Sequence, residues 1–255
     1  MKMRLVLLGT GTSQGVPVIG CDCVVCQSNN PKDNRLRTSA LVKTKSGNIL
    51  IDIGPDFRTQ MLKSKNNNIH SVLLTHQHRD HTAGLDDIRP IYYSHKKPIN
   101  LYAEDHVFKA LKSDFSYLFN DNEYPGKPKI NVSIINDKPF DILNTPILPI
   151  RAMHHRLPIL GYRIGDLSYV TDANYISPDE KKKIIGSKVL ILNSLQRKPH
   201  ISHYNLEQSL ALIKELNPEK AYLTHISHEM GTYDSVSQEL PKNVFLAYDN
   251  LEISF

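Results

Sequence analysis

The segment Thr75-His76-Gln77-His78-Arg79-Asp80-His81 follows directly on the apolar run Ser71-Val72-Leu73-Leu74. It places three imidazoles and a carboxylate within six positions, an H-x-H-x-D-H pattern at the end of a predicted strand. Borderline divalent metals such as Zn²⁺ prefer these ligands. Alternate residues of an extended or looped segment share a face, so His76 and His78 can point together. Asp80 and His81 are offset and can address a neighbouring ion. The pattern therefore predicts metal-dependent hydrolysis rather than a chance His-rich loop.

Length and composition indicate an ordinary globular protein. The chain has 255 residues, of which 40% are hydrophobic and 22% charged, and we find no repeat or linker, so we expect one domain over residues 1–255. The longest apolar runs, Leu5–Leu8 and Val189–Leu192, are too short to cross a bilayer. Without a signal-peptide pattern we expect a cytoplasmic location and no membrane partner. The net charge of +5 is mild and only weakly favours nucleic-acid binding.

Strand patterns outnumber helix patterns and cluster in each half of the chain. We expect strands at 4–8, 38–44, 48–53, 71–74, 99–103, 130–135, 147–153, 162–171 (a hairpin), 189–193, 221–224, 244–247 and 251–255. We expect helices at 57–65, 82–89, 104–119, 178–185 and 205–216, the last capped by Asn205. Two packed sheets flanked by helices fit this distribution best. Three glycines in Gly9–Gly15 indicate tight turns near a site. The G-x-G among them is not a dinucleotide-binding motif, because no helix pattern follows it.

Three later strands also end in metal-ligand residues. The strand at 147–153 leads into His154 and His155, the hairpin into Asp172, and the strand at 221–224 into His225. Singly, each is more often a satisfied polar group than a ligand. Together they complete two ligand sets, with Asp172 bridging and metals roughly 3.5–4 Å apart. Of the adjacent pair we favour His154, because His155 would point the other way.

All three cysteines lie in Cys21-Asp22-Cys23-Val24-Val25-Cys26. A C-x-C-x-x-C cluster in a reducing compartment indicates metal binding, although reduced thiols without metal or a redox site are alternatives. Tetrahedral structural zinc needs a fourth ligand. We favour His228, three residues after His225, with Asp22 or His70 as alternatives.

His200 and His203 precede the helix predicted from Asn205. A helix N-terminus lowers the pKa of a nearby His, so a carboxylate or phosphate would be needed to keep it protonated. Simple helix entry explains the pair equally well. We place His203 ahead of His200 as a candidate general acid, and the sequence alone does not separate them.

The residues resemble the metallo-β-lactamase superfamily. The resemblance lies in the order along the chain of His76-x-His78-x-Asp80-His81, His154, Asp172 and His225. The opening Leu8-Gly9-Thr10-Gly11-Thr12-Ser13, the cysteine cluster and Thr224–His228 resemble the PhnP-like branch, which is related to tRNase Z and has an extra structural zinc. The resemblance implies an α+β fold, a four-layer αββα sandwich with the metals at one edge. It implies phosphodiester hydrolysis, supports Cys21, Cys23, Cys26 and His228 as zinc ligands, and places His203 where the family has its leaving-group His.

These observations predict a binuclear metal-dependent phosphodiesterase for small, including cyclic, nucleotide or ribose phosphate esters. We expect His76, His78 and His154 to hold one Zn²⁺ or Mn²⁺, and Asp80, His81 and His225 the other. Metal-bound hydroxide would attack phosphorus in line, and we count Asp80 and His203 as catalytic. Asp52 would orient the His segment from behind.

Two alternatives remain from the residues. One is hydrolysis of a carbon ester, thioester or lactone with the same metals, and the other is a non-catalytic metal-binding scaffold. The long arm by which tRNase Z grips tRNA is missing, and Asn120–Pro128 is the only loop of that character. Large RNA is therefore disfavoured as a partner, and the chain could form a homodimer.

Overall fold

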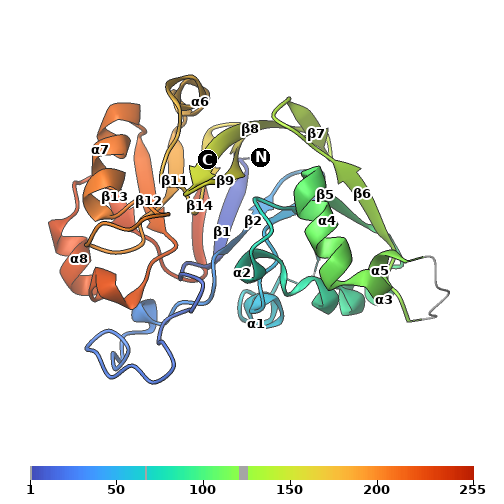
Figure 1. Ribbon diagram of the computed structural model, residues 1–255, viewed down its shortest axis with the longest axis horizontal. Helices are drawn as coiled ribbons and strands as arrows, with labels where there is room; N and C mark the ends of the chain where they lie inside the picture. Colours follow the sequence, from blue (N-terminus) through green and yellow to red (C-terminus); the bar gives the residue numbers. More distant parts are fainter. Residues whose placement is uncertain (1, 67, 121–125) are drawn as a thin grey trace.

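Two seven-stranded sheets form the centre of the computed structural model, which describes residues 2–66, 68–120 and 126–255 (Figure 1). The first sheet has the order β14 (Leu251–Ser254), β1 (Arg4–Gly9), β2 (Ser39–Lys43), β3 (Asn48–Ile51), β4 (Ser71–Leu73), β5 (Ile99–Ala103), β6 (Ile130–Ile134). The second has the order β13 (Val244–Leu246), β12 (Lys220–Thr224), β11 (Val189–Asn193), β10 (Leu167–Val170), β9 (Leu157–Ile164), β8 (Thr145–His154), β7 (Phe140–Ile142). β1 and β14 pair side by side, so the two ends of the chain meet in one sheet.

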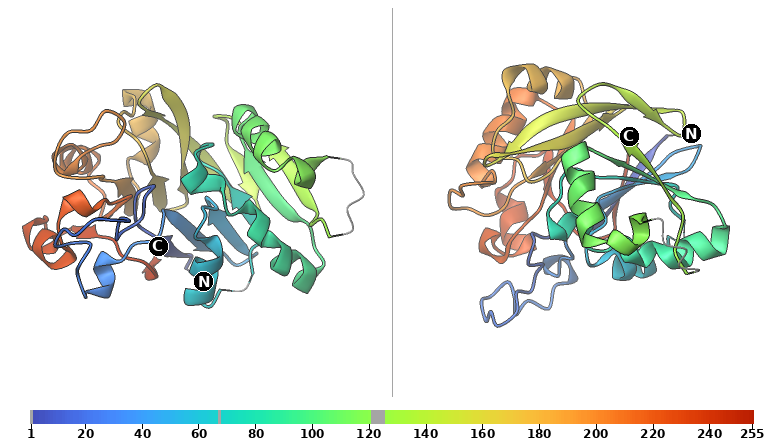
Figure 2. Two further views of the ribbon diagram at one scale, coloured as in Figure 1. Left: turned by 60° about the horizontal axis from the view of Figure 1, so that its bottom comes forward. Right: turned by 45° about the vertical axis from the view of Figure 1, so that its right-hand side comes forward.

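Helices cover the outer faces of both sheets (Figure 2). Those of the first half are α1 (Phe57–Lys63), α2 (Arg79–Thr82), α3 (Arg89–His95), α4 (Asp105–Asp114) and α5 (Ser116–Phe119), with 3-10 turns η1 (Pro31–Asp33) and η2 (Leu85–Ile88). Those of the second half are α6 (Pro178–Ile184), α7 (Leu206–Leu216) and α8 (Tyr233–Glu239), with the 3-10 turn η3 (His228–Met230). Together with the sheets they form the αββα sandwich that the sequence predicted.

The apolar runs of the strands explain the layers. Successive side chains of a strand point to opposite faces, so a strand buried on both faces is apolar throughout. In β1, Leu5 and Leu7 pack between the sheets, whereas Val6 and Leu8 pack under the helices of the first half. β11 repeats this pattern against the helices of the second half. One core lies between the sheets and two lie beneath the helices.

Strand direction brings the polar strand ends to one edge. β3, β4, β5 and β6 are parallel, as are β10, β11, β12 and β13. β8 runs in the same direction as β10, because both pair antiparallel with β9. Asp52 and His225 directly follow β3 and β12, and Asp172 lies two residues after β10. All three have left-handed backbone, with φ of 61°, 55° and 59° for Asp52, His225 and Asp172. Non-glycine residues rarely adopt this conformation, and they do so mostly at functional sites.

Several element boundaries differ from the prediction. The helix expected at 82–89 is replaced by α2, which begins inside the His segment at Arg79, and by η2 and α3. The helix expected over 104–119 breaks at Phe115, whose φ of −122° and ψ of 46° are not helical. β7 and α8 were not predicted from the sequence. None of the helices in the described part of the chain combines the length and apolar character needed to span a bilayer.

Candidate metal centre

The structure brings the seven predicted His and Asp ligands together at the edge where the strands end. One group comprises His76, His78 and His154, and the other Asp80, His81, Asp172 and His225. Within each group the potential ligand atoms all lie within 4.8 Å of one another. β4 and α2 position four of these side chains, and the ends of β8, β10 and β12 position the rest. The second half of the chain thus completes a site that the first half begins.

Asp172 lies between the two groups. Its Oδ2 atom is 4.0 Å from Nε2 of His76 and 3.4 Å from Nε2 of His81. Its other oxygen, Oδ1, is 3.1 Å from Nδ1 of His225. A carboxylate with both oxygens directed at different imidazoles is placed to bridge two cations.

Groups behind the ligands fix their orientation. Asp52 is fully buried, and its Oδ2 is 2.7 Å from Nδ1 of His81. The same carboxylate accepts hydrogen bonds from the backbone N–H and the hydroxyl of Thr75. Nδ1 of His154 lies 2.9 Å from the carbonyl oxygen of Ser202, which can only accept. In both histidines the Nδ1 proton is therefore held behind the site, and Nε2 is left for a ligand.

Burial and charge favour the protonation states that metal ligands need at His76, His225 and Asp172. At His81 burial would lower the pKa, but Asp172, Asp80 and Asp52 outweigh it and raise the pKa well above its usual value, so this imidazole must give up a proton when a cation binds. Burial lowers the pKa of His76 well below its usual value, and its buried Nε2 has no hydrogen-bond partner. Burial also lowers the pKa of His225 to about 3. For Asp172, burial would raise the pKa, but His225 and His81 outweigh it and hold the pKa well below its usual value. Neutral imidazoles with free lone pairs and ionised carboxylates fit a pair of divalent ions.

His203 lies beside the centre and His200 behind it. The largely buried His203 places Nε2 3.3 Å from Oδ2 of Asp172 and stacks on His225 with 4.9 Å between ring centroids. His200 is exposed, and its Nδ1 lies 3.2 Å from Nδ1 of His203. Asn205 caps α7 as predicted, with a reciprocal bond to Gln208. Both histidines thus lie on the segment that leads into this cap.

His155 lies outside both groups. It is exposed and has left-handed backbone, and its N–H donates to Oδ1 of Asn174. The preference for His154 therefore agrees with the geometry.

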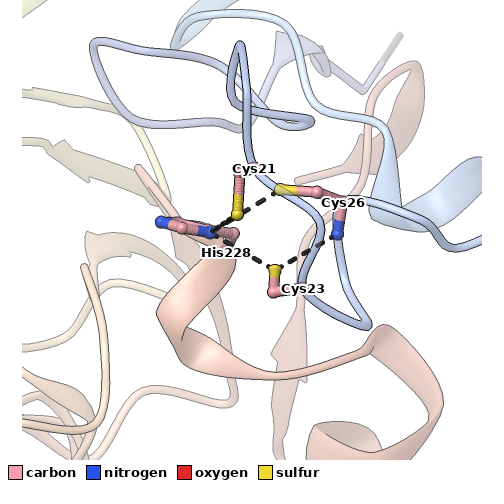
Figure 3. Close-up of side chains that lie close together, drawn as sticks. All are labelled: Cys21, Cys23, Cys26 and His228. Carbon is pink, nitrogen blue, oxygen red and sulfur yellow. Dashed lines mark hydrogen bonds between the residues drawn. The ribbon is translucent and has the colours of Figure 1, made fainter.

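The three cysteines surround His228 in a second cluster (Figure 3). Sγ of Cys21, Cys23 and Cys26 lies 3.2, 3.4 and 3.6 Å from Nδ1 of His228. The cysteines are free of disulfides and half-buried. The donor set is that of a Cys₃His zinc site, and the distances among the four atoms fit one tetrahedral ion.

Neither alternative fourth ligand joins the cysteine cluster. Asp22 Oδ1 accepts a hydrogen bond from the Gln27 side chain. His70 lies at the start of β4, where its Nδ1 accepts the N–H of Asn48. Of the three candidates, the geometry retains His228.

Two threonines that were not predicted from the sequence contact His225. The hydroxyl of Thr38 lies 3.2 Å from its Nδ1, and that of Thr12 lies 3.4 Å from its Nε2. The glycine-rich opening was the only signal for them. The backbone there packs closely, since a Cβ on Gly9 would lie 2.0 Å from the carbonyl oxygen of Arg37. The loop also bonds to Ile226, the residue after His225, through Thr10 and Thr12.

The two sheets, their helices and the His and Asp centre define the class of metallo-β-lactamase-fold proteins, which bind divalent metals and are mostly hydrolases. Residues 47–226 match the family described as "Beta-lactamase superfamily domain". Over its whole length the chain is 34% identical to a solved structure described as "a New Diphosphatase from the PhnP Family", with a TM-score of 0.94 and 98% of that chain covered. The chain belongs to the PhnP family of the beta-lactamase superfamily.

Other relatives are named for different activities. A protein of Porphyromonas gingivalis named octanoyltransferase is 40% identical over 98% of this chain and 51% of its own length. Coenzyme PQQ synthesis protein B of Rhodopseudomonas palustris is 28% identical over 59% of this chain and 49% of its own length. The chain thus spans about half the length of these curated relatives. The short form of human tRNase Z shares the fold at 18% identity, with a TM-score of 0.71 and 98% of each chain covered.

Proposed function

We propose that this protein is a binuclear metal-dependent phosphodiesterase that acts on small nucleotide or ribose phosphate esters, cyclic ones included. The observation that carries the proposal is Asp172, which contacts residues of both ligand groups while His203 directs Nε2 at the same carboxylate. A two-ion centre suits in-line displacement at phosphorus, and an imidazole beside it suits the departure of an alkoxide.

Different residues of the chain would have different roles in such a site. Two divalent ions, when bound by the two groups, would lower the pKa of a water towards roughly 7 and offset the charge that develops on phosphoryl oxygens. Asp52 keeps the Nδ1 proton of His81 away from the ligand side. Ser202 does the same for His154 through its carbonyl oxygen. His203 would give its Nε2 proton to the leaving oxygen.

We also propose Zn²⁺ or Mn²⁺ for the His and Asp centre and Zn²⁺ for the Cys₃His cluster. Imidazole and carboxylate ligands suit both ions, whereas thiolates select zinc among them. The metal-loaded protein should then contain about three ions per chain, two at the His and Asp centre and one at the Cys₃His cluster. Three free cysteines are consistent with the reducing cytoplasm.

The relative named a diphosphatase supports phosphoryl transfer, because it matches the whole chain at 34% identity. Large RNA stays disfavoured on the sequence. Residues 121–125 of the Asn120–Pro128 loop, on which that expectation partly depends, lie outside the described residues. A homodimer stays a prediction.

A second candidate function is hydrolysis of a thioester or other carbon ester. It is favoured by the 40% identity to the octanoyltransferase, whose name concerns acyl groups. Only half of that protein aligns, so the name can describe the other half.

A substrate panel separates the two candidates. Bis(p-nitrophenyl) phosphate and a cyclic ribose phosphate should be turned over by the metal-loaded protein, whereas an octanoyl thioester, nitrocefin and a lactone should not. Asp80→Ala is the matched variant, because it removes a ligand and leaves the sheets intact. We expect it to lower phosphodiester turnover by about 10³-fold or more. Turnover of carbon esters alone would overturn the proposal in favour of the second candidate, and no turnover at all would favour a scaffold.

A further inference from the structure

His200 is a histidine that the proposed chemistry does not use, and it contacts the proposed general acid. Its ring is exposed at the surface, yet its Nδ1 lies 3.2 Å from Nδ1 of the largely buried His203. We propose that His200 is a positioning residue, whose Nδ1 accepts a hydrogen bond from Nδ1 of His203 and so holds that ring with Nε2 directed at the metal centre. This inference rests on the proposed phosphodiester hydrolysis.

The direction of the hydrogen bond follows from a neighbouring group. The backbone N–H of Ser202 points at Nδ1 of His200 with a nitrogen–nitrogen distance of 3.4 Å. An amide N–H can only donate, so Nδ1 of His200 has the lone pair and the ring proton is on Nε2. Two ring nitrogens can share a hydrogen bond only if one of them is protonated. The proton between His200 and His203 therefore belongs to His203, whose N–H, at 3.2 Å, shares the single lone pair of His200 Nδ1 with the N–H of Ser202.

The charge environment favours the same arrangement. Partial burial and the neighbouring His203 lower the pKa of His200, whereas Glu229 opposes them. A neutral His200 is the form that can accept at Nδ1. The hydroxyl of Ser202 is a competing partner, since its Oγ lies 3.0 Å from Nδ1 of His203 and 3.3 Å from Nδ1 of His200. The experiment must separate these two acceptors.

The tautomer matters because His203 must be left neutral, with its proton on Nδ1, after it has protonated the leaving group. When the bond from phosphorus to the leaving oxygen breaks, the bonding electrons go to that oxygen, which takes the Nε2 proton of His203. The imidazole that remains is neutral and keeps its proton on Nδ1. His200 stabilises this tautomer by accepting from Nδ1, as a carboxylate does in other acid–base histidines. The effect should therefore grow as the leaving group becomes more basic.

Two substitutions of equal polarity test the role of Nδ1. In His200→Asn the Oδ1 atom can occupy the place of Nδ1 and accept, whereas in His200→Gln the amide lies one bond further from the backbone. Each is assayed on a phosphodiester with a p-nitrophenyl leaving group and on one with an alkyl leaving group. For His200→Gln we expect the ratio of alkyl to aryl kcat to fall about tenfold, with KM changed less than about twofold. His200→Asn should recover most of that ratio.

A spectroscopic readout tests the tautomer without turnover. In ¹⁵N correlation spectra of the zinc-loaded protein, His203 should be protonated at Nδ1, and His200→Gln should change that pattern while His200→Asn should keep it. Ser202→Ala serves as the comparison for the competing acceptor.

The possible failures are distinguishable. If the wild type hydrolyses both diesters but His200→Gln leaves the alkyl-to-aryl ratio unchanged, the inference is overturned. The same holds if Ser202→Ala alone lowers the ratio, or if Nδ1 of His203 is unprotonated. If the wild type hydrolyses neither diester, the proposed function fails, and the kinetic role of His200 fails with it.

Discussion

The two metal-ligand clusters differ in how the chain supports them. The His and Asp centre lies at the ends of strands from both sheets, and its inner members His76, His81, Asp172 and His225 are almost fully buried. The Cys₃His cluster joins residues 21–26, which have no regular strand or helix, to the start of η3. Its four side chains are all half-buried. In Figure 1 the cysteine segment is the dark blue loop that extends from the sheets at the lower left.

The ligands of the two clusters are therefore held in place by different parts of the structure. The strands and the bonds from Asp52 and Thr75 hold the His and Asp centre in place through the packed core. The cysteine loop has little core of its own, since Val25 is buried but Val24 and Ile19 are exposed. A metal bound to that loop would therefore contribute to its folding, whereas metals at the central site would contribute mainly to chemistry. His225 of the central site and His228 of the Cys₃His cluster are three residues apart, so one short segment contributes a ligand to each cluster.

Of the substitutions that compare the two clusters, Asp52→Asn should produce the largest effect and affect only the central cluster. An amide nitrogen cannot accept from Nδ1 of His81, and a flipped amide cannot also accept both Thr75 hydrogen bonds. We expect phosphodiester kcat/KM to fall about 10–100-fold, with metal lost from the central site. Elemental analysis checks this, because the zinc that we propose for the Cys₃His cluster would provide an internal reference of one ion per chain.

The matched control is Asp56→Asn, four residues further along. Asp56 also accepts hydrogen bonds, from the backbone and guanidinium of Arg37, but contacts none of the seven ligands in the bonds described. Its activity should stay close to that of the wild type. Equal losses in the two variants would mean that Asp52 acts through general stability rather than through His81.

His228→Ala should do the opposite and affect stability more than chemistry. Without its only nitrogen ligand the cysteine loop should lose its zinc. We expect Tm to fall by roughly 5–10 °C, which corresponds to about 2–3 kcal/mol for a chain of this size. Activity at low temperature should fall less than about tenfold, because the strand ends hold the central ligands. Calorimetry and zinc content check both.

His106→Ala, which removes an exposed histidine of α4, is the control for the loss of an imidazole. An unchanged Tm for His228→Ala would show that the cysteine loop does not need a fourth ligand. A loss of activity as large as that of Asp52→Asn would erase the contrast between the clusters.

The sequence predicted the central cluster well because its ligands follow recognisable strands. β4, β10 and β12 each appear as short apolar runs, and parallel strands must bring their ends to one edge. The local geometry was less predictable. From the sequence we expected Thr75–His81 to be extended or looped, whereas Asp80 and His81 lie in the first turn of α2. The helical turn brings the side chains of these two residues to the same group.

The contacts of the two threonines with His225 could not be predicted from the sequence. Thr38 and Thr12 precede His225 by 187 and 213 residues, and no local pattern marks a hydroxyl as the partner of a remote imidazole. α8 was missed for a related reason. Its sequence, Tyr233–Glu239, has few strong helix formers, and it depends on a Thr232 cap and on the burial of Val236 under the second sheet.

The pH dependence of zinc binding at the Cys₃His cluster is the smallest expected effect. The backbone N–H of Cys26 lowers the pKa of Cys23 to about 6, whereas burial raises the pKa of Cys26 to about 11. At pH 7.5 zinc must therefore displace a proton from Cys26 but almost none from Cys23. Below the pKa of Cys23 that thiol is protonated too, so zinc binding must release about one further proton. The zinc affinity should therefore fall more steeply with decreasing pH as the pH drops through about 6.

Cobalt can report this dependence, because thiolate-to-Co²⁺ charge-transfer absorption arises at the cysteine cluster and not at a His and Asp site. A steeper slope alone would not identify Cys23, because the cluster has other ligands that can bind protons. Cys23→Ser resolves the ambiguity, since a serine hydroxyl does not titrate in this range. If the steepening disappears in this variant, it belongs to Cys23. If it persists, the lowered pKa of Cys23 has no part in metal binding.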